Sequence, residues 1–110
     1  MPNLPVHIDL AHRAARRLDS PELDAYMGYF LLGSTSPDVR AITKRRREEY
    51  HFAPLSFESV GAGVQGLFDA NPHLRAGSNG NGRTRAFVAG YITHLTLDEA
   101  WITEMYRPHF

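Results

Sequence analysis

The chain has 110 residues, enough for one compact domain, and 43% of them are hydrophobic, which is ordinary for a globular protein. It contains no cysteine, so disulfides, zinc–thiolate sites and cysteine nucleophiles are excluded, and His, Asp and Glu are left as the strong metal ligands. The twelve basic and twelve acidic residues balance, so the net charge gives no reason to expect a stable nucleic-acid partner.

The first predicted helix follows Pro5 and covers residues 6–18. Leu10, Ala14 and Leu18 recur at four-residue spacing, which is typical of the buried side of an amphipathic helix. Arginines between them are available for the opposite, solvated side. We therefore expect this helix to pack through its leucine-containing stripe.

A second helix is predicted from residue 20 to about residue 32, because it starts with Ser-Pro-Glu. Ser caps a helix, Pro suits its first position and Glu complements the helix dipole. Gly33 is the residue type most often found just past a helix end, and residues 33–38 then have the composition of a turn-rich loop. Asp38 is thus expected on a loop that connects packed helices.

Two further helices complete the predicted fold. One covers residues 57–70, and a surface loop rich in Gly, Asn and Pro follows over residues 71–82. Thr84 can cap the last helix. One apolar stripe is expected to be buried along that helix: Phe87, Tyr91, Leu95, Ile102 and Met105. No segment alternates like a β-strand, so the sequence predicts an all-α fold, a helical bundle of about four main helices.

The last helix carries the most informative motif, His94-x-x-x-Asp98. Side chains four residues apart on a helix lie roughly 5–6 Å apart at Cβ, close enough for an imidazole and a carboxylate to bind one ion. By itself the motif more often reflects an ordinary His–Asp pair or a buried His satisfied by hydrogen bonds. Three further candidates, His7, Asp38 and His51, stand where a helix begins or a loop meets apolar sequence. Because buried carboxylates need a compensating cation, we predict a metal site built from these five residues.

Four segments in this order resemble a known family. They are residues 7–14 (HIDLAHRA), 32–38 (LGSTSPD), 50–52 (YHF) and 86–98 (AFVAGYITHLTLD). Together they resemble the zinc-dependent phospholipase C family of bacteria, which is related to zinc-dependent single-strand nucleases. The resemblance extends from residue 4 to about residue 102.

The resemblance implies an all-α fold, a phosphodiester or phospholipid substrate, and one or two bound zinc ions, with Mn²⁺ and Fe²⁺ as alternatives. Carried over by position, it makes His7 the ligand on the first helix, Asp38 the aspartate that bridges neighbouring ions, and His51 the ligand of the His-Phe element. His94 and Asp98 match the helical ligands. Asp38 is then also the catalytic candidate, which orients the attacking water or accepts its proton.

Three parts of the family pattern have no counterpart in the chain. Secreted members use an N-terminal Trp ligand, which residues 1–5 do not supply; a further His after the H-x-x-x-D motif is replaced by Glu104; and a downstream His and Glu are missing. His109 does not match by spacing and is expected to be an exposed tail residue. We interpret residues 1–110 as a single helical metal-binding domain, the front portion of a longer hydrolase, with a shortened natural paralogue as the alternative.

Two other segments admit more than one interpretation. Residues 61–66 satisfy the text of a dinucleotide-binding fingerprint, but the strand and parallel sheet that it needs are missing, so these small residues are expected to allow close helix packing. The basic run at residues 40–47 either holds a substrate phosphate or is a solvated connection neutralised by Glu48 and Glu49. The second interpretation is preferred, because such runs usually face water.

Two functions are therefore carried forward. The first is a zinc-dependent hydrolase of phosphodiester bonds that uses a metal-activated water. The second is a non-catalytic helical module that binds metal or a protein partner. Because residues 1–5 lack the features of a signal peptide and no segment approaches the length of a membrane span, we expect a cytoplasmic protein without a transmembrane segment.

Overall fold

The computed structural model describes residues 2–75 and 81–109, and in these residues it is built from helices and turns without a strand. The all-α prediction is confirmed, and the four longest helices in this part of the chain are the four main helices that were expected. In chain order the elements are α1 (Leu4–Leu18), α2 (Pro21–Ala25), α3 (Met27–Thr35), η1 (Ser36–Val39), α4 (Arg40–Thr43), α5 (Glu48–His51), α6 (Ala62–Ala70), η2 (Pro72–Leu74), α7 (Gly82–Trp101), η3 (Ile102–Tyr106) and α8 (Arg107–His109).

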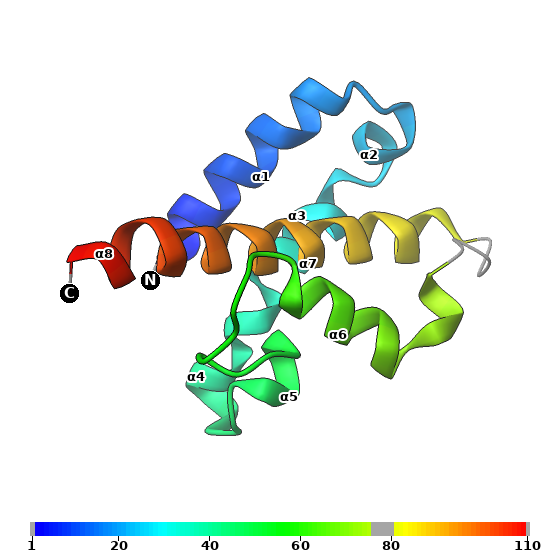
Figure 1. Ribbon diagram of the computed structural model, residues 1–110. Helices are drawn as coiled ribbons and strands as arrows, with labels where there is room; N and C mark the ends of the chain where they lie inside the picture. Colours follow the sequence, from blue (N-terminus) through cyan, green and yellow to red (C-terminus); the bar gives the residue numbers. More distant parts are fainter. Residues whose placement is uncertain (1, 76–80, 110) are drawn as a thin grey trace.

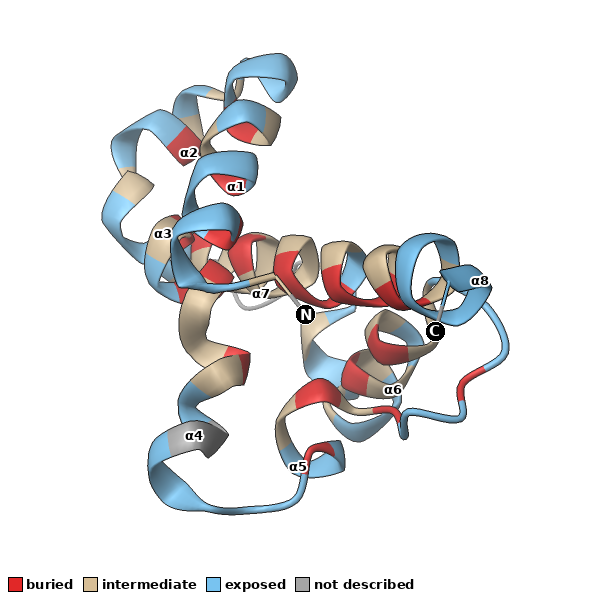
Figure 2. Cartoon of the chain, turned by 90° about the vertical axis from the view of Figure 1, so that its left-hand side faces the viewer, coloured by how far each residue is buried: buried red, intermediate tan, exposed pale blue. Residues whose placement is uncertain are grey.

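Helix α7 is the spine of the molecule. It runs through the middle of the fold, and α1, α3 and α6 all contact it (Figure 1). Buried residues are concentrated along α7 and on the sides of the neighbouring helices that face it (Figure 2). A side chain on the inner face of α7 is therefore surrounded by segments from the whole length of the chain.

Helices α3 and α7 cross at two glycines. A Cβ added to Gly33 would collide with the backbone carbonyl of Phe87, and one added to Gly90 would collide with the carbonyl of Phe30. Each helix therefore approaches the other's backbone where a side chain is missing. The prediction that Gly33 ends the second helix is wrong, because α3 continues to Thr35 and the glycine serves this crossing.

The predicted second helix is in fact two helices, α2 and α3, separated at Tyr26. Ser20 caps α2 as predicted, since its hydroxyl accepts a hydrogen bond from the backbone N–H of Leu23 at 3.4 Å. Tyr26 leaves helical geometry, with φ −118° and ψ 35°. The chain turns there, so that α2 contacts α7 through a hydrogen bond of 2.8 Å from Arg85 Nε to Glu22 while α3 crosses α7 elsewhere.

Helix α1 packs through a different side from the one predicted. Its buried residues are His7, Ala11 and Ala15, whereas Leu10 and Leu18 are 39% and 65% exposed. Alanine side chains are small enough to let α1 lie close against α3 and α7. The stripe of Leu10, Ala14 and Leu18 is thus displaced by one helical position from the face that packs.

The starts of the last two main helices also differ from prediction. Helix α6 begins at Ala62 rather than at residue 57, because Gly61 adopts φ 110° and interrupts any helical run before it. Helix α7 begins at Gly82 rather than after Thr84, because the side chain of Asn81 accepts a hydrogen bond from the N–H of Arg83 at 2.9 Å and caps the helix earlier. Of the predicted loop at 71–82, residues 76–80 lie outside the described part of the chain.

The helical path of α7 continues through a π-helical turn, η3, into α8. Along the predicted stripe, Leu95 and Ile102 are buried, and Phe87 and Tyr91 are half-buried. Met105 is exposed, contrary to the prediction, because a π-helical turn contains more residues than an α-helical turn and rotates the following side chains off the stripe.

The small residues at the start of α6 allow close packing, as expected. A Cβ added to Gly66 would collide with the carbonyl of Phe52, and one added to Gly63 would lie 2.8 Å from the carbonyl of His51. No helix within residues 2–75 and 81–109 is both long enough and apolar enough to cross a membrane.

Candidate metal centre

The five residues predicted as ligands converge at the inner face of α7. His7 comes from α1, Asp38 from η1, His51 from α5, and His94 and Asp98 from α7. Two sets of three have donor atoms that lie within 4.8 Å of one another. The first set is His7, His94 and Asp98; the second is Asp38, His51 and His94. The centre thus joins four segments that are distant in the sequence, and its two sets share one imidazole.

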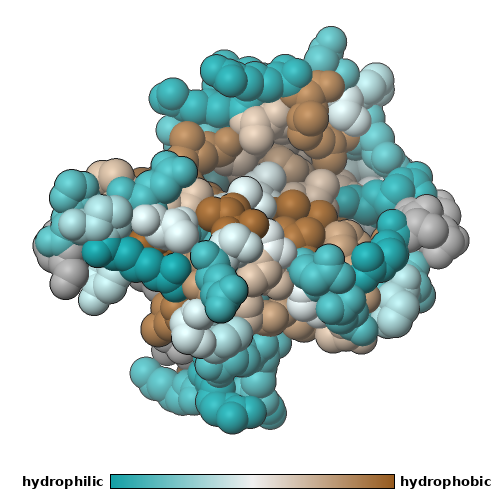
Figure 3. Space-filling model, viewed as in Figure 1, coloured by the Kyte–Doolittle hydropathy of each residue, from teal (hydrophilic) through white to brown (hydrophobic). Residues whose placement is uncertain are grey.

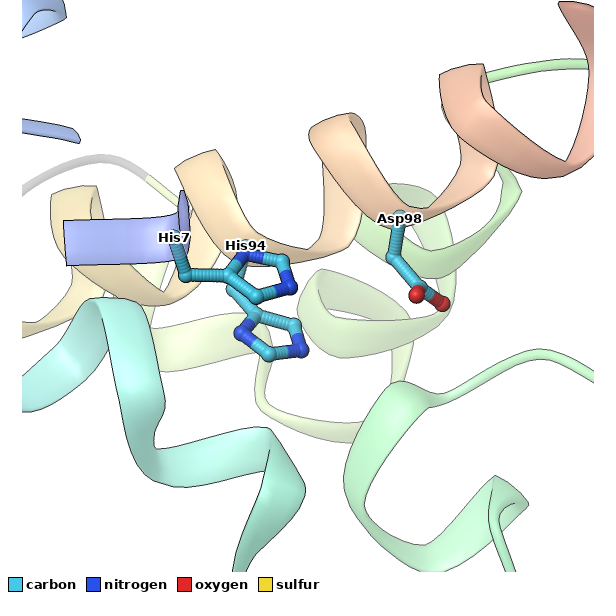
Figure 4. Close-up of side chains that lie close together, drawn as sticks. All are labelled: His7, His94 and Asp98. Carbon is cyan, nitrogen blue, oxygen red and sulfur yellow. The ribbon is translucent and has the colours of Figure 1, made fainter. Parts of the chain in front are cut away.

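His94 and Asp98 lie one helical turn apart on α7, as the motif predicts, and both are buried. The ring of His7 stacks on the ring of His94, with 3.6 Å between centroids and an angle of 8° between planes. The close-up shows the two rings one above the other, with the Asp98 carboxylate on the same side of α7 (Figure 4). His7, His94 and Asp98 therefore form the inner, solvent-shielded set.

Asp38 lies on the more open side of the centre. One of its oxygens, Oδ1, is 3.3 Å from His94 Nε2 and 3.6 Å from His51 Nε2. Its side chain is 35% exposed, whereas the two imidazoles are buried. The predicted loop around it is wrong: α3 runs on to Thr35 and the 3-10 helix η1 follows directly, so Asp38 is held by helical geometry.

The backbone fixes the orientation of His94. Its Nδ1 lies 2.7 Å from the carbonyl oxygen of Ser34. A carbonyl only accepts hydrogen bonds, so Nδ1 carries the proton and donates it, and the lone pair of the neutral ring is on Nε2. This is the outer contact that commonly orients a metal-binding histidine.

Several buried nitrogens of the centre have no hydrogen-bond partner within the described residues: His7 Nε2, His94 Nε2, and both ring nitrogens of His51. An unsatisfied buried polar group costs free energy, and so many in one place require a common explanation. A divalent cation accepts the lone pairs of neutral imidazoles and the charge of carboxylates at once. The residues present therefore fit a metal ion.

The charge states also suit metal binding. Burial, followed by the charge of His94, lowers the pKa of His7 to about 4, and burial, followed by the charge of Arg47, lowers the pKa of His51 to about 4. Burial acts to raise the pKa of Asp38, but the neighbouring imidazoles, His94 first, outweigh it and lower that pKa. Near neutral pH these residues are thus neutral imidazoles and an ionised carboxylate, the forms that bind metal.

Arg47 does not fit the preferred interpretation of the basic run as a solvated connection. Its side chain is buried, and its Nη2 lies 2.5 Å from Asp98 Oδ2. The solvated interpretation holds for Lys44, Arg45 and Arg46, which are exposed, and Arg45 pairs with Glu49 at 3.6 Å. A signal was available, because Arg47 precedes His51 by four residues and a helical turn places both on one side.

Glu99 is a second buried charge that the sequence did not reveal. Its carboxylate accepts hydrogen bonds from the backbone N–H groups of Gly61 at 2.9 Å and Gly63 at 2.7 Å. It therefore fastens the start of α6 to α7, beside the metal centre but outside both ligand sets. Glu104 and His109, the other titratable residues considered near the end of the chain, are exposed.

An apolar hollow adjoins the inner side of the centre. It lies between α1 and α7 and has a volume of about 440 Å³. Brown, apolar surfaces flank the space between the two helices (Figure 3). Its lining residues are His7, Leu10, Ala11, Ala14, Ile92, Thr93, Thr96, Leu97 and Ala100. The exposed side of Leu10, which was predicted to be buried, forms part of this hollow.

The fold and the centre together define a class: an all-α protein with a buried cluster of metal-ligand residue types on a central helix. Within that class, the family model described as zinc dependent phospholipase C matches residues 6–101. The chain therefore belongs to the zinc-dependent phospholipase C family, and the resemblance noted from its motifs is confirmed. No curated protein and no solved structure matches the chain.

Proposed function

We propose that the protein is a zinc-dependent hydrolase of phosphodiester bonds, with ligands drawn from His7, Asp38, His51, His94 and Asp98. The observation that carries this proposal is the group of buried imidazole nitrogens, gathered around carboxylates, that have no hydrogen-bond partner in the part of the chain that the structure describes. The family supports zinc as the metal. Nitrogen and oxygen donors also suit Mn²⁺ or Fe²⁺, so the identity of the ion belongs to the proposal.

A bound zinc ion would supply Lewis acidity, which lowers the pKa of water and stabilises negative charge on a phosphodiester. Asp38 is the residue placed to act on the attacking water, because its carboxylate is ionised and partly open to solvent. It accepts the proton of the water as the oxygen attacks phosphorus and the ester P–O bond breaks, and it then gives this proton to the departing alkoxide, which restores the carboxylate. The carbonyl of Ser34 keeps His94 in the tautomer that this arrangement needs.

The substrate is proposed to be a phosphodiester with an apolar part, such as a phospholipid. His7 is one of the residues that line the hollow between α1 and α7, so the hollow can receive an apolar group beside the centre. Of the basic run, only Arg47 reaches the ligand residues among the side chains that the structure describes. A cytoplasmic location is part of the same proposal.

The test is hydrolysis by purified protein of verified zinc content. Substrates are a chromogenic phosphodiester, phosphatidylcholine and single-stranded DNA, and the expected result is hydrolysis of at least the first. Asp38→Asn should lower the rate by about 100-fold or more, the range typical of a positioned acid–base group. Asp69→Asn, which changes an exposed aspartate on α6, is the matched control. If the zinc-loaded protein cleaves none of these substrates, the hydrolase proposal is lost.

One observation favours the second candidate, a non-catalytic metal-binding or interaction module. The buried charge of Asp98 is already neutralised by Arg47, so this carboxylate does not need a metal ion to compensate its charge. Stoichiometric zinc without hydrolysis of any of the three substrates would identify such a module.

A further inference from the structure

The buried ion pair between Arg47 and Asp98 determines whether the Asp98 carboxylate is free to bind a metal ion. Asp98 Oδ2 lies 2.5 Å from Arg47 Nη2 and 3.9 Å from His51 Nε2. The exposed fractions of the Arg47 and Asp98 side chains are only 8% and 4%. Both charges are out of water, so each depends on the other, and removal of either alone leaves an uncompensated buried charge.

The shared histidine limits the number of ions. Both ligand sets include His94. Its Nδ1 donates to the carbonyl of Ser34, which leaves only Nε2 with a lone pair for an ion. One nitrogen lone pair binds one cation, so the two sets of three ligands cannot both be complete at the same time.

The position of Arg47 leads to the same conclusion. Its guanidinium lies against Asp98, the carboxylate of the set formed with His7 and His94, so a second divalent ion in that set would lie beside a buried positive charge. Such a contact between like charges is costly at low dielectric.

The set around Asp38 is the better of the two for that one ion. The unpaired Nε2 atoms of His94 and His51 both face Asp38 Oδ1, at 3.3 and 3.6 Å. Asp38 is partly exposed, so an ion there keeps a position open to water, as catalytic zinc sites do. In the other set all three residues are buried, and its carboxylate is paired with Arg47.

We infer that the chain binds a single divalent cation through Asp38, His51 and His94, and that the guanidinium of Arg47 serves as the second cation of the centre by neutralising Asp98. The inference deepens the proposed function and rests on it. It assigns His7 and Asp98 to positions beside the ion: the His7 ring supports His94 by stacking, and the Asp98–Arg47 pair closes the inner side.

The test is zinc stoichiometry by native mass spectrometry, with affinity measured by chelator competition, on the whole chain. Wild type should bind one zinc ion. Asp38→Asn should weaken binding by more than about 100-fold, which exceeds the loss typical of an outer partner. Asp69→Asn, the exposed control on α6, should leave the affinity unchanged.

The decisive variant removes both members of the buried pair, Arg47→Met with Asp98→Asn, so that no unpaired charge remains in the interior. The inferred arrangement predicts one zinc ion, with an affinity within about 100-fold of wild type, since neither residue binds the ion and both act only as outer partners. Circular dichroism establishes that the variant is folded, and His51→Gln provides a second single-site check, with the same loss expected as for Asp38→Asn.

The outcomes separate the two proposals. Two zinc ions on wild type, or loss of zinc from the folded double variant, would overturn the single-ion inference and leave the metal-dependent hydrolase standing. No zinc on wild type would overturn both.

Discussion

Within the centre, His94 has one ring nitrogen committed to the backbone and one available. His7 and His51 are more unusual, because burial keeps their imidazoles neutral at pH values where an exposed imidazole is protonated. The same burial that keeps these imidazoles in the form that binds metal also makes the stability of the fold depend on pH. When the ion is removed, protonation of either buried imidazole destabilises the folded state.

This coupling predicts a pH dependence of the metal-free protein. The pKa values of His7 and His51 are about 4 in the folded state, against 6.5 for an unperturbed histidine. Between these limits the unfolded chain binds more protons, so stability is fully present above about pH 6.5 and declines as the pH falls toward about 4. Urea unfolding in the presence of a chelator should give a lower free energy of unfolding at about pH 5 than at about pH 7.

His7→Phe is the informative variant, because it keeps a ring against His94 and removes one titrating group. The difference between the two pH values should shrink in this variant, whereas exposed His109→Gln should leave it unchanged. An equal pH dependence in wild type and His7→Phe would contradict the assignment.

The sequence could identify individual site residues only where they stand in a short motif. The five ligand candidates stand in short motifs whose order is visible, and the structure brings them together, although their role as ligands stays a prediction. Spacing places Arg47 beside His51, but the pairing of Arg47 with Asp98 and of Glu99 with Gly63 could not be found in the same way. Their partners Asp98 and Gly63 are 51 and 36 positions away, and no spacing rule connects such distances.

At the scale of the elements, the crossing of α3 and α7 depends on two missing side chains. We predict that Gly90→Ala lowers the free energy of unfolding by about 2 kcal/mol or more. The new Cβ would collide with the carbonyl of Phe30, and a backbone group inside a helix cannot move aside as a flexible side chain can. Gly28→Ala on α3 has open space around the new Cβ and should instead stabilise by about 0.5–1 kcal/mol. Chemical denaturation measures the free energy of unfolding of both variants, and equal changes in the two would contradict the close approach of α3 and α7 at Gly90.

The attachment of α6 to α7 makes a separate prediction. Glu99→Gln replaces a carboxylate that accepts two backbone N–H groups with an amide that can accept through one oxygen only. The free energy of unfolding of the metal-free protein should fall by about 1–3 kcal/mol. Exposed Glu104→Gln should change it by less than about 0.5 kcal/mol. A Glu99→Gln variant as stable as wild type would show that α6 is held by its apolar contacts alone.

The helices themselves were predictable, but their ends and faces were less so. Periodicity and capping residues located the four main helices in the correct order, although the predicted second helix is divided into α2 and α3. The break at Tyr26 and the rotation of α1 toward Ala11 and Ala15 follow from how α3 and α7 must meet, which is a property of the packed molecule. Leu10 was therefore predicted to be buried, whereas it lines the hollow between α1 and α7.

At the scale of the whole molecule, the centre is where separate segments meet. Helix α1, the turn η1, the short helix α5 and the spine α7 each contribute a side chain, and apolar contacts form two separate core clusters away from it. An ion bound here would therefore link four segments that come from distant parts of the chain. Metal binding should accordingly be a large part of the stability of the fold.

We predict that zinc raises the thermal unfolding temperature of the protein and that Asp38→Asn removes most of this effect. A ligand that binds only the folded state stabilises it by about 2.7 kcal/mol when its concentration is 100-fold above its dissociation constant. Differential scanning calorimetry with and without zinc measures the shift, with Asp69→Asn as the exposed control and magnesium as the control ion. Because zinc also binds exposed imidazoles such as His109, a shift that persists unchanged in Asp38→Asn would place the stabilising ion elsewhere and contradict the centre as the link between these segments.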